Sequence, residues 1–149
     1  MKPVEFQTTW GTITLTLDGG GKAVALDLPH LNKNPTAEFS VTHSEFNSAG
    51  FFRQVEKEFG PVKIPKGTEF QQAVWNEMRK IPRGQTRTYG EIATAIGRPK
   101  AVRAVGTACG VNPLPVFIPC HRVVAKNGLG GFGSGLPWKI LLLNLEGAL

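Results

Sequence analysis

Cysteine and histidine are scarce in this chain. Its 149 residues include two cysteines, Cys109 and Cys120, which are too few for a disulfide framework. The three histidines stand far apart, at positions 30, 43 and 121, so no group of ligands has the spacing of a zinc site. We therefore expect no metal and no cofactor, and we expect the protein in a reducing, intracellular compartment.

Long apolar runs are also missing. No segment approaches the roughly 20 apolar residues that a membrane-spanning helix requires, and residues 1–6 lack the apolar core of a signal peptide. The chain has no internal repeat and no low-complexity segment. These absences favour a globular protein of the cytoplasm without a membrane partner.

Negative charge is scarce in one part of the chain only. Residues 1–66 hold seven Lys and Arg against seven Asp and Glu. Residues 67–149 hold ten Lys and Arg against four Asp and Glu, and so carry the whole net charge of +6. A basic half indicates a polyanionic partner, of which nucleic acid is the simplest. A basic domain that is merely soluble would show the same charge.

The N-terminal part reads as a small sheet with one covering helix. Alternating polarity predicts three antiparallel strands within residues 3–29. Residues 29–48 are rich in Pro, Asn and Ser and predict a loop. The apolar spacing over residues 51–59 predicts a helix that covers the sheet, and residues 60–67 form the predicted linker to a second domain.

The C-terminal part reads as a series of short helices. Capping boxes at residues 68–71 and 88–91 predict the first turns of two of them. Gly97 predicts a tight turn and Pro99 predicts the first position of the next helix, which together indicate a helix-turn-helix. The expected buried face of that last helix consists of Val102, Val105 and Cys109.

A cysteine occupies the centre of the most distinctive stretch. Pro119 precedes Cys120 and has no N–H, so we expect Cys120 at the end of an extended segment rather than inside a helix. His121 and Arg122 follow directly and offer the base or positive charge that a thiol needs to act as a nucleophile. A small buried hydrophobic side chain is the alternative interpretation of this cysteine.

The last segment combines a glycine-rich loop with a carboxylate. Five glycines within residues 128–135 predict a permissive loop. It lacks the context of a phosphate-binding loop, so a pocket wall or lid is expected. A helix from near Pro137 follows. Glu146 lies at its end, where the helix dipole disfavours a carboxylate, and we expect His121 to compensate this charge.

Five motifs occur in one order within residues 67–149. They are Tyr89-Gly90-Glu91-Ile92-Ala93, Pro99 to Gly106, Asn112-Pro113, Pro119-Cys120-His121-Arg122-Val123 and Leu145-Glu146-Gly147. With this order and spacing, the chain resembles the O6-alkylguanine-DNA alkyltransferases, which are also called methylated-DNA–protein-cysteine methyltransferases. Over residues 1–66 the resemblance is much weaker.

The resemblance implies DNA repair by direct reversal. Cys120 would accept the alkyl group of O6-alkylguanine, and also of O4-alkylthymine, after the base has flipped out of duplex DNA. Glu146 and His121 would activate the thiol, and Tyr89 would donate a hydrogen bond to the departing guanine. The product is a thioether that nothing in the motif would hydrolyse, so each molecule would react once.

The resemblance also implies which residues bind the substrate. Arg103 would take the place of the flipped base, from a helix that lies in the minor groove of double-stranded DNA. The other expected DNA contacts are Tyr89, Lys100, Ala101, Ala104 and Thr107. The expected pocket residues are Asn112, Pro119, Val123, Gly131, Phe132 and Ser134.

The implied fold is of the α/β (α+β) class. Residues 1–66 would form a ribonuclease H-like domain with a small antiparallel sheet and a covering helix. Residues 67–149 would form a mostly helical, winged-helix-like domain that contains the helix-turn-helix. We expect the protein to act as a monomer.

Three other functions stay open on the residues alone. A non-catalytic binder of alkylated DNA is one, although a related group of such binders has tryptophan at the position of Cys120. A helix-turn-helix transcription regulator would bind one DNA sequence tightly and leave the lesion in place. A cysteine hydrolase that uses Cys120 and His121 would turn over repeatedly on an acyl substrate.

Overall fold

A computed structural model describes residues 1–42 and 46–149. Part of the expected loop over residues 29–48 therefore lies outside the described residues, and so does His43. The elements are β1 (Lys2–Thr8), β2 (Gly11–Leu17), β3 (Ala23–Asp27), α1 (Phe51–Phe59), α2 (Glu69–Met78), β4 (Arg87–Thr88), α3 (Tyr89–Ala95), α4 (Val102–Gly110), the 3-10 turn η1 (Cys120–Arg122), β5 (Val123–Val124) and α5 (Leu136–Leu145).

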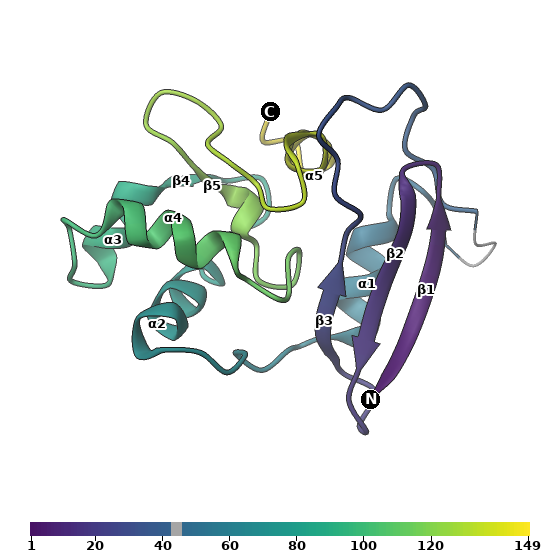
Figure 1. The fold of residues 1–149 in the computed structure, drawn as a ribbon, viewed down its shortest axis with the longest axis horizontal. Coiled ribbons are helices and arrows are strands. Elements are labelled where there is room, and N and C mark those ends of the chain that lie inside the picture. The colour runs from purple at the N-terminus through teal and green to yellow at the C-terminus, as the bar shows by residue number, and fades with distance from the viewer. Residues whose placement is uncertain (43–45) are drawn as a thin grey trace.

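The first three strands form an antiparallel sheet in the order β1-β2-β3 (Figure 1). Alternate residues of β2 are apolar, and Ile13 and Leu15 on one face are completely buried. Helix α1 covers this face, where the ring of Phe51 packs against that of Phe6 with centroids 5.1 Å apart. The predicted meander with a covering helix is therefore confirmed.

Both predicted capping boxes begin helices. The Thr68 side chain accepts the N–H of Gln71 at the start of α2, and the Thr88 side chain accepts the N–H of Glu91 at the start of α3. In each box the side chain of the later residue also accepts the N–H of the threonine. These reciprocal bonds satisfy donors that a helix N-terminus otherwise leaves unpaired.

The prediction for α4 was wrong at its first turn. Pro99 lies in a turn that the bond from Ala101 N–H to the Arg98 carbonyl closes at 2.9 Å, and the helix begins at Val102. Val102 was expected inside but is 42% exposed. Ala108 is buried one turn beyond Val105 instead.

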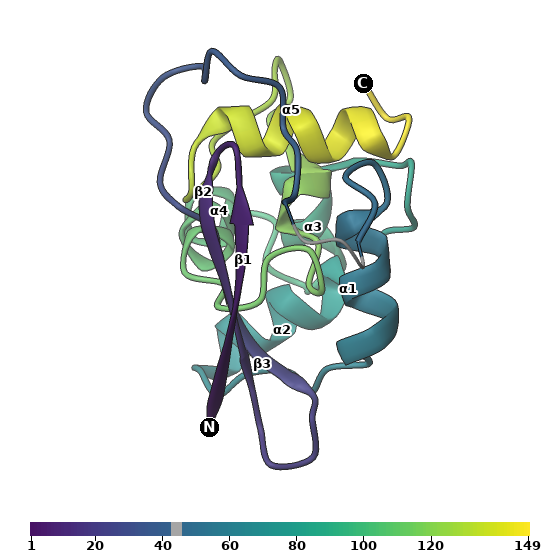
Figure 2. The same cartoon turned by 90° about the vertical axis from the view of Figure 1, so that its right-hand side faces the viewer.

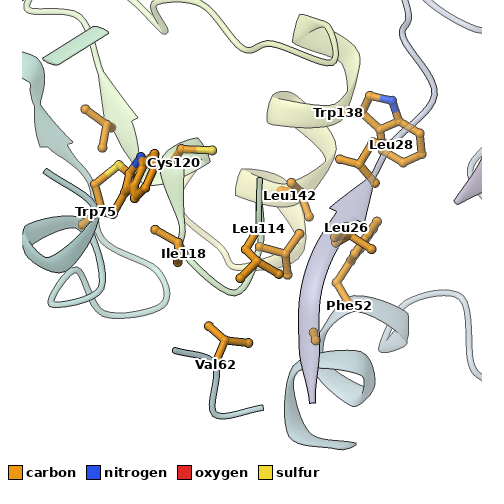
Figure 3. Packing of buried hydrophobic residues seen from close by; sticks show 14 of the residues in the cluster. Leu26, Leu28, Phe52, Val62, Trp75, Leu114, Ile118, Cys120, Trp138 and Leu142 are labelled. Atoms are coloured by element: carbon orange, nitrogen blue, oxygen red, sulfur yellow. The ribbon is translucent and has the colours of Figure 1, made fainter. Parts of the chain in front are cut away.

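Helix α5 lies between the sheet with its covering helix α1 on one side and helices α2, α3 and α4 on the other (Figure 1; Figure 2 shows the turned view). Its Trp138 is fully buried, with its ring 5.0 Å from that of Trp10. Figure 3 shows Leu26 of β3 close to Leu114 and Leu142, and all three belong to one hydrophobic cluster. One core thus joins the small sheet to the helical part in a mixed α/β fold, which confirms the expected class.

None of the helices among the described residues has the length and apolar character that spanning a membrane requires.

Candidate active site

Cys120 begins a short turn, which corrects one expectation. It is the first residue of η1, a 3-10 turn, and not the end of an extended segment. Cys120 N–H donates to the Ile118 carbonyl at 2.7 Å, and Arg122 N–H donates to the Pro119 carbonyl at 2.9 Å. Pro119 keeps a longer helix from forming, as expected, but its carbonyl remains free to close this tight turn.

The side chain of Cys120 borders a pocket of about 850 Å³. Tyr89 of α3 lines this pocket, Arg103 and Gly106 of α4 form a second side, and Gly131 and Phe132 of the glycine-rich loop form a third. A pocket of this size with few polar groups is typical of small-molecule binding. The expectation that the glycine-rich loop forms a pocket wall is confirmed.

Tyr89 packs against the glycine-rich loop. A Cβ atom at Gly130 would lie 2.7 Å from the Tyr89 hydroxyl, and Gly130 has φ +74°, so glycine is required there on both counts. The Tyr89 hydroxyl donates to the Gly131 carbonyl over a long 3.5 Å. Burial raises the pKa of Tyr89, so its hydroxyl keeps its proton and can act as a donor.

Glu146 has one neutral and two positively charged partners at the end of α5. His121 Nε2–H donates to Glu146 Oε2 at 2.8 Å, as the helix-end argument predicted. Arg122 forms a two-pronged pair with the same carboxylate, at 2.8 and 2.7 Å. Arg122 also donates to the Ile81 carbonyl at 2.9 Å, and Arg83 approaches Glu146 to 3.9 Å. The carboxylate is therefore held in one position.

These contacts fix the protonation states of the pair. Burial alone would raise the pKa of Glu146, but the bonds from Arg122 and His121 lower it to about 2. Burial lowers the pKa of His121, so its imidazole is neutral at pH 7. Since Nε2 carries the proton that Glu146 accepts, Nδ1 has a free lone pair. This Nδ1 is buried and has no hydrogen-bond partner among the described residues.

The thiol of Cys120 is buried beside a cation. Burial raises the pKa of Cys120, while a hydrogen bond from the Asn112 side chain and the charge of Lys139 offset part of the rise. Lys139 is itself fully buried, and its Nζ donates to the Val123 carbonyl at 2.7 Å and to the Gly131 carbonyl at 3.0 Å. Burial lowers the pKa of Lys139 to about 8, so most of it is charged at neutral pH.

Two of these partners were missed by sequence reasoning. Arg122 was expected only as a positive charge beside the Cys120 thiol. Its pairing with Glu146 depends on the turn at η1. Lys139 did leave a signal, because it is the only charged residue of α5; it stands between Trp138 and Ile140, and four leucines follow. A lone charge in an otherwise apolar helix indicates a buried ion with a partner.

The expected pocket residues separate into two groups. Gly131 and Phe132 line the pocket. Asn112 lies behind Cys120, where its Nδ2 donates to the Ile118 carbonyl at 2.8 Å. The backbone carbonyls of the remaining three residues are engaged in supporting bonds. They are Pro119, Val123 and Ser134, which bind Arg122, Lys139 and Leu31 respectively.

The expected DNA contacts gather on one surface beside the pocket. Arg103 and Lys100 line the rim of the pocket, and both are exposed. Ala104 and Thr107 are exposed on α4, and Ala101 is the partly buried N-cap residue of that helix. Long basic side chains thus stand above a surface of small residues next to Cys120.

Comparison with known proteins adds independent findings. A family model described as "6-O-methylguanine DNA methyltransferase, DNA binding domain" matches residues 69–148. The chain is 54% identical to a methylated-DNA–protein-cysteine methyltransferase of Methanosarcina acetivorans over 150 residues, which cover 96% of each protein.

Solved structures give the same result in three dimensions. An O6-methylguanine methyltransferase of Mycobacterium tuberculosis matches with a TM-score of 0.72 and 34% identity, over 98% of this chain and 92% of that one. The structure of Mycobacterium tuberculosis OGT in complex with DNA matches with a TM-score of 0.70 and 34% identity, over 97% and 91%.

Proposed function

Because the chain belongs to the family of the 6-O-methylguanine DNA methyltransferases, we propose that Cys120 is the residue through which it repairs DNA. The protein is a DNA repair enzyme that moves the alkyl group of O6-alkylguanine to a cysteine of its own. One observation supports Cys120 above all. It borders the pocket and is followed by a buried His121 whose Nε2 is held by Glu146 and whose Nδ1 is free.

The reaction is a displacement at saturated carbon. His121 Nδ1 takes the proton of the Cys120 thiol through a bridging water, and Glu146 stabilises the imidazolium that forms. The thiolate attacks the alkyl carbon, so the S–C bond forms while the C–O6 bond breaks and its electron pair goes to guanine. Tyr89 donates a hydrogen bond to the departing base. The thioether product is stable, and each molecule reacts once.

The alkylated base reaches Cys120 only after leaving the duplex. Its alkyl carbon is inaccessible in stacked DNA, so the nucleotide rotates into the pocket at a cost of a few kcal/mol. Arg103 stands at the pocket rim and fills the space in the stack. Its helix α4 presents the small residues Ala101 and Ala104, which suit the narrow minor groove. Contacts with the phosphate backbone of the DNA then dominate the binding. One protein monomer is sufficient for the repair of one lesion.

Several finer features are part of the same proposal. O4-alkylthymine carries the same alkyl–oxygen bond and would react in the same way. Residues 1–66 and 67–149 form two domains, the first ribonuclease H-like and the second winged-helix-like, with α3 and α4 as its helix-turn-helix. The protein works in the cytoplasm, at the nucleoid in a prokaryote.

Titration with damaged DNA tests this function. An excess of duplex that contains O6-methylguanine is incubated with the protein, and the remaining lesion is quantified. We expect the loss to stop at one lesion per protein molecule, and a Cys120→Ser variant to bind the duplex without removing any lesion. Repeated turnover would contradict the single-use mechanism, and full repair by Cys120→Ser would exclude Cys120. Binding without repair by the unaltered protein would support a non-catalytic binder instead.

A further inference from the structure

The segment after β3 lies directly against the glycine-rich loop. Residues 29–31 are named the strap here. Leu31 N–H of the strap donates to the Ser134 carbonyl at 2.9 Å, and His30 Nδ1 lies 3.2 Å from the Gly133 carbonyl. Since a carbonyl only accepts, His30 must carry a proton on Nδ1 in this contact. The N-terminal part of the chain is thus bonded to successive residues of the loop that encloses the pocket.

The position of the strap is itself fixed. Its Pro29 carbonyl accepts a hydrogen bond from Trp138 Nε1 at 2.8 Å, and Trp138 is fully buried in α5. Gly135 has φ +110°, and a Cβ atom there would lie 2.0 Å from the Leu31 carbonyl oxygen. Only glycine permits this close approach of two backbones. Figures 1 and 2 show the segment after β3 passing beside α5.

The wall of the pocket depends on such contacts because it has no regular structure of its own. Residues 129–133 form neither helix nor strand. In the middle of this stretch, the Gly131 carbonyl is held by Lys139 at 3.0 Å. At its end, the Gly133 carbonyl is held by His30 of the strap. Gly131 and Gly133 both line the pocket, so the strap supports one end of the surface that the alkylated base would face.

We propose that the strap positions the pocket wall for alkyl transfer and that His30 is a positioning residue of the reaction. This inference rests on the proposed function of Cys120. In-line displacement requires the base to be held in one orientation, and a small misplacement of a supporting group lowers the rate. Residues 1–66 would therefore contribute to the reaction by positioning the pocket wall, besides covering the hydrophobic core.

Exchange of His30 tests the inference. His30→Ala removes the donor, whereas His30→Asn places an amide N–H near the position of Nδ1–H. We expect His30→Ala to slow the single-turnover reaction about fivefold, the effect of losing one neutral hydrogen bond. The slowing should be equal for duplex O6-methylguanine and for the free base O6-benzylguanine, because both use the same pocket. His30→Asn should recover most of the rate, and Asn32→Ala, a change at an exposed neighbour, should leave it unchanged.

Exchange of Gly135 gives a second, independent test. Gly135→Ala forces the two backbones apart and should slow the reaction more than His30→Ala does, with the affinity for undamaged duplex unchanged. Gly128→Ala is the matched control in the same loop, because a Cβ atom there meets nothing within 4 Å. If a melting curve shows that Gly135→Ala does not fold, the His30 variants alone test the role of the strap.

The outcomes separate this inference from the proposed function. Wild-type rates in a folded His30→Ala protein, or slow reaction in both His30→Ala and His30→Asn, would overturn the role of His30. A loss confined to duplex substrate would also overturn it, since that result indicates DNA binding rather than the pocket. If Cys120 of the unaltered protein does not accept the alkyl group from O6-methylguanine, the proposed function is wrong.

Discussion

Glu146 has the strongest charge contacts in the active site. Its pKa is lowered from 4.5 to about 2, and its side chain is only 5% exposed. A carboxyl group whose pKa is depressed on folding stabilises the protein above its unfolded pKa, and this stability is lost as the pH falls through the folded pKa. The relevant window thus runs from about pH 4.5 down to about pH 2.

We therefore expect Glu146→Gln to lose stability in a pH-dependent way. Urea unfolding should give a deficit of roughly 3 kcal/mol at pH 7, from the size of the pKa shift. The deficit should shrink as the pH is lowered from about 4.5 to about 2, because Glu146 of the unfolded wild-type chain takes up a proton in this window while the folded carboxylate stays ionised until about pH 2. Glu77→Gln serves as control, since its ion pairs with Lys80 and Arg87 are more exposed and contribute less. A deficit that is constant with pH would contradict this assignment.

Lys139 should control the acidity of the Cys120 thiol. Its buried ammonium is charged below a pKa of about 8 and favours the thiolate. We expect Lys139→Met to shift the pH midpoint of Cys120 alkylation by iodoacetamide upward, with the modified residue identified by peptide mapping. Lys100→Met, a change at an exposed residue of the pocket rim, should leave the midpoint in place. An unchanged midpoint in Lys139→Met would mean that the cation only holds the wall.

Individual site residues were predictable to the degree that local sequence controls them. The pairing of His121 with Glu146 followed from the cost of a carboxylate at a helix C-terminus. The pairing of Arg122 with Glu146 did not, because it depends on which way a 3-10 turn directs successive side chains. Val123 was expected in the pocket. Its carbonyl instead accepts a hydrogen bond from Lys139 of α5, a contact between distant elements that local sequence does not reveal.

At the scale of elements, α4 and its Arg103 carry the proposed DNA contact. Arg103 is exposed at the rim of the pocket and is not needed for thiol activation. We expect Arg103→Ala to slow repair of duplex O6-methylguanine at least tenfold, because the flipped state loses its support, a step that costs a few kcal/mol. Single-turnover rates with free O6-benzylguanine should stay near wild type. Equal losses on both substrates would remove Arg103 from base flipping.

Element boundaries were predictable where side chains cap the backbone. The boxes at Thr68 and Thr88 located the starts of α2 and α3, since each is a local pattern with its own hydrogen bonds. The start of α4 has no side-chain cap, and Pro99 fits a turn as well as a first helical position. The sequence around Pro99 is therefore compatible both with a turn and with the first position of a helix.

At the scale of the whole molecule, the two proposed domains share one core. The Leu26 N–H of β3 donates to the Pro113 carbonyl at 2.9 Å, and Leu26 packs in one cluster with Leu114 and Leu142 (Figure 3). Such contacts across 80 or more positions leave no periodic signal, so a boundary at residue 66 could be predicted from local composition but the shared core could not. The strap was hidden for the same reason.

We expect a single unfolding transition despite the two proposed domains. Trp10 lies beside the N-terminal sheet and Trp75 in α2. In variants whose only tryptophan is Trp10 or Trp75, with Trp138 and the other one replaced by phenylalanine, urea unfolding monitored by fluorescence should have the same midpoint as unfolding monitored by circular dichroism. Two separate midpoints would show that the domains unfold independently and that the shared cluster contributes little.

The central claim is that Cys120 is the alkyl acceptor, and the mass of the intact protein tests it most directly. After incubation with a duplex that contains O6-methylguanine, we predict a single mass increase of one methylene group, which peptide mapping assigns to Cys120. The reaction should be complete at one equivalent of lesion. An unchanged mass with DNA binding intact, or a methyl group mapped to Cys109, would contradict the account.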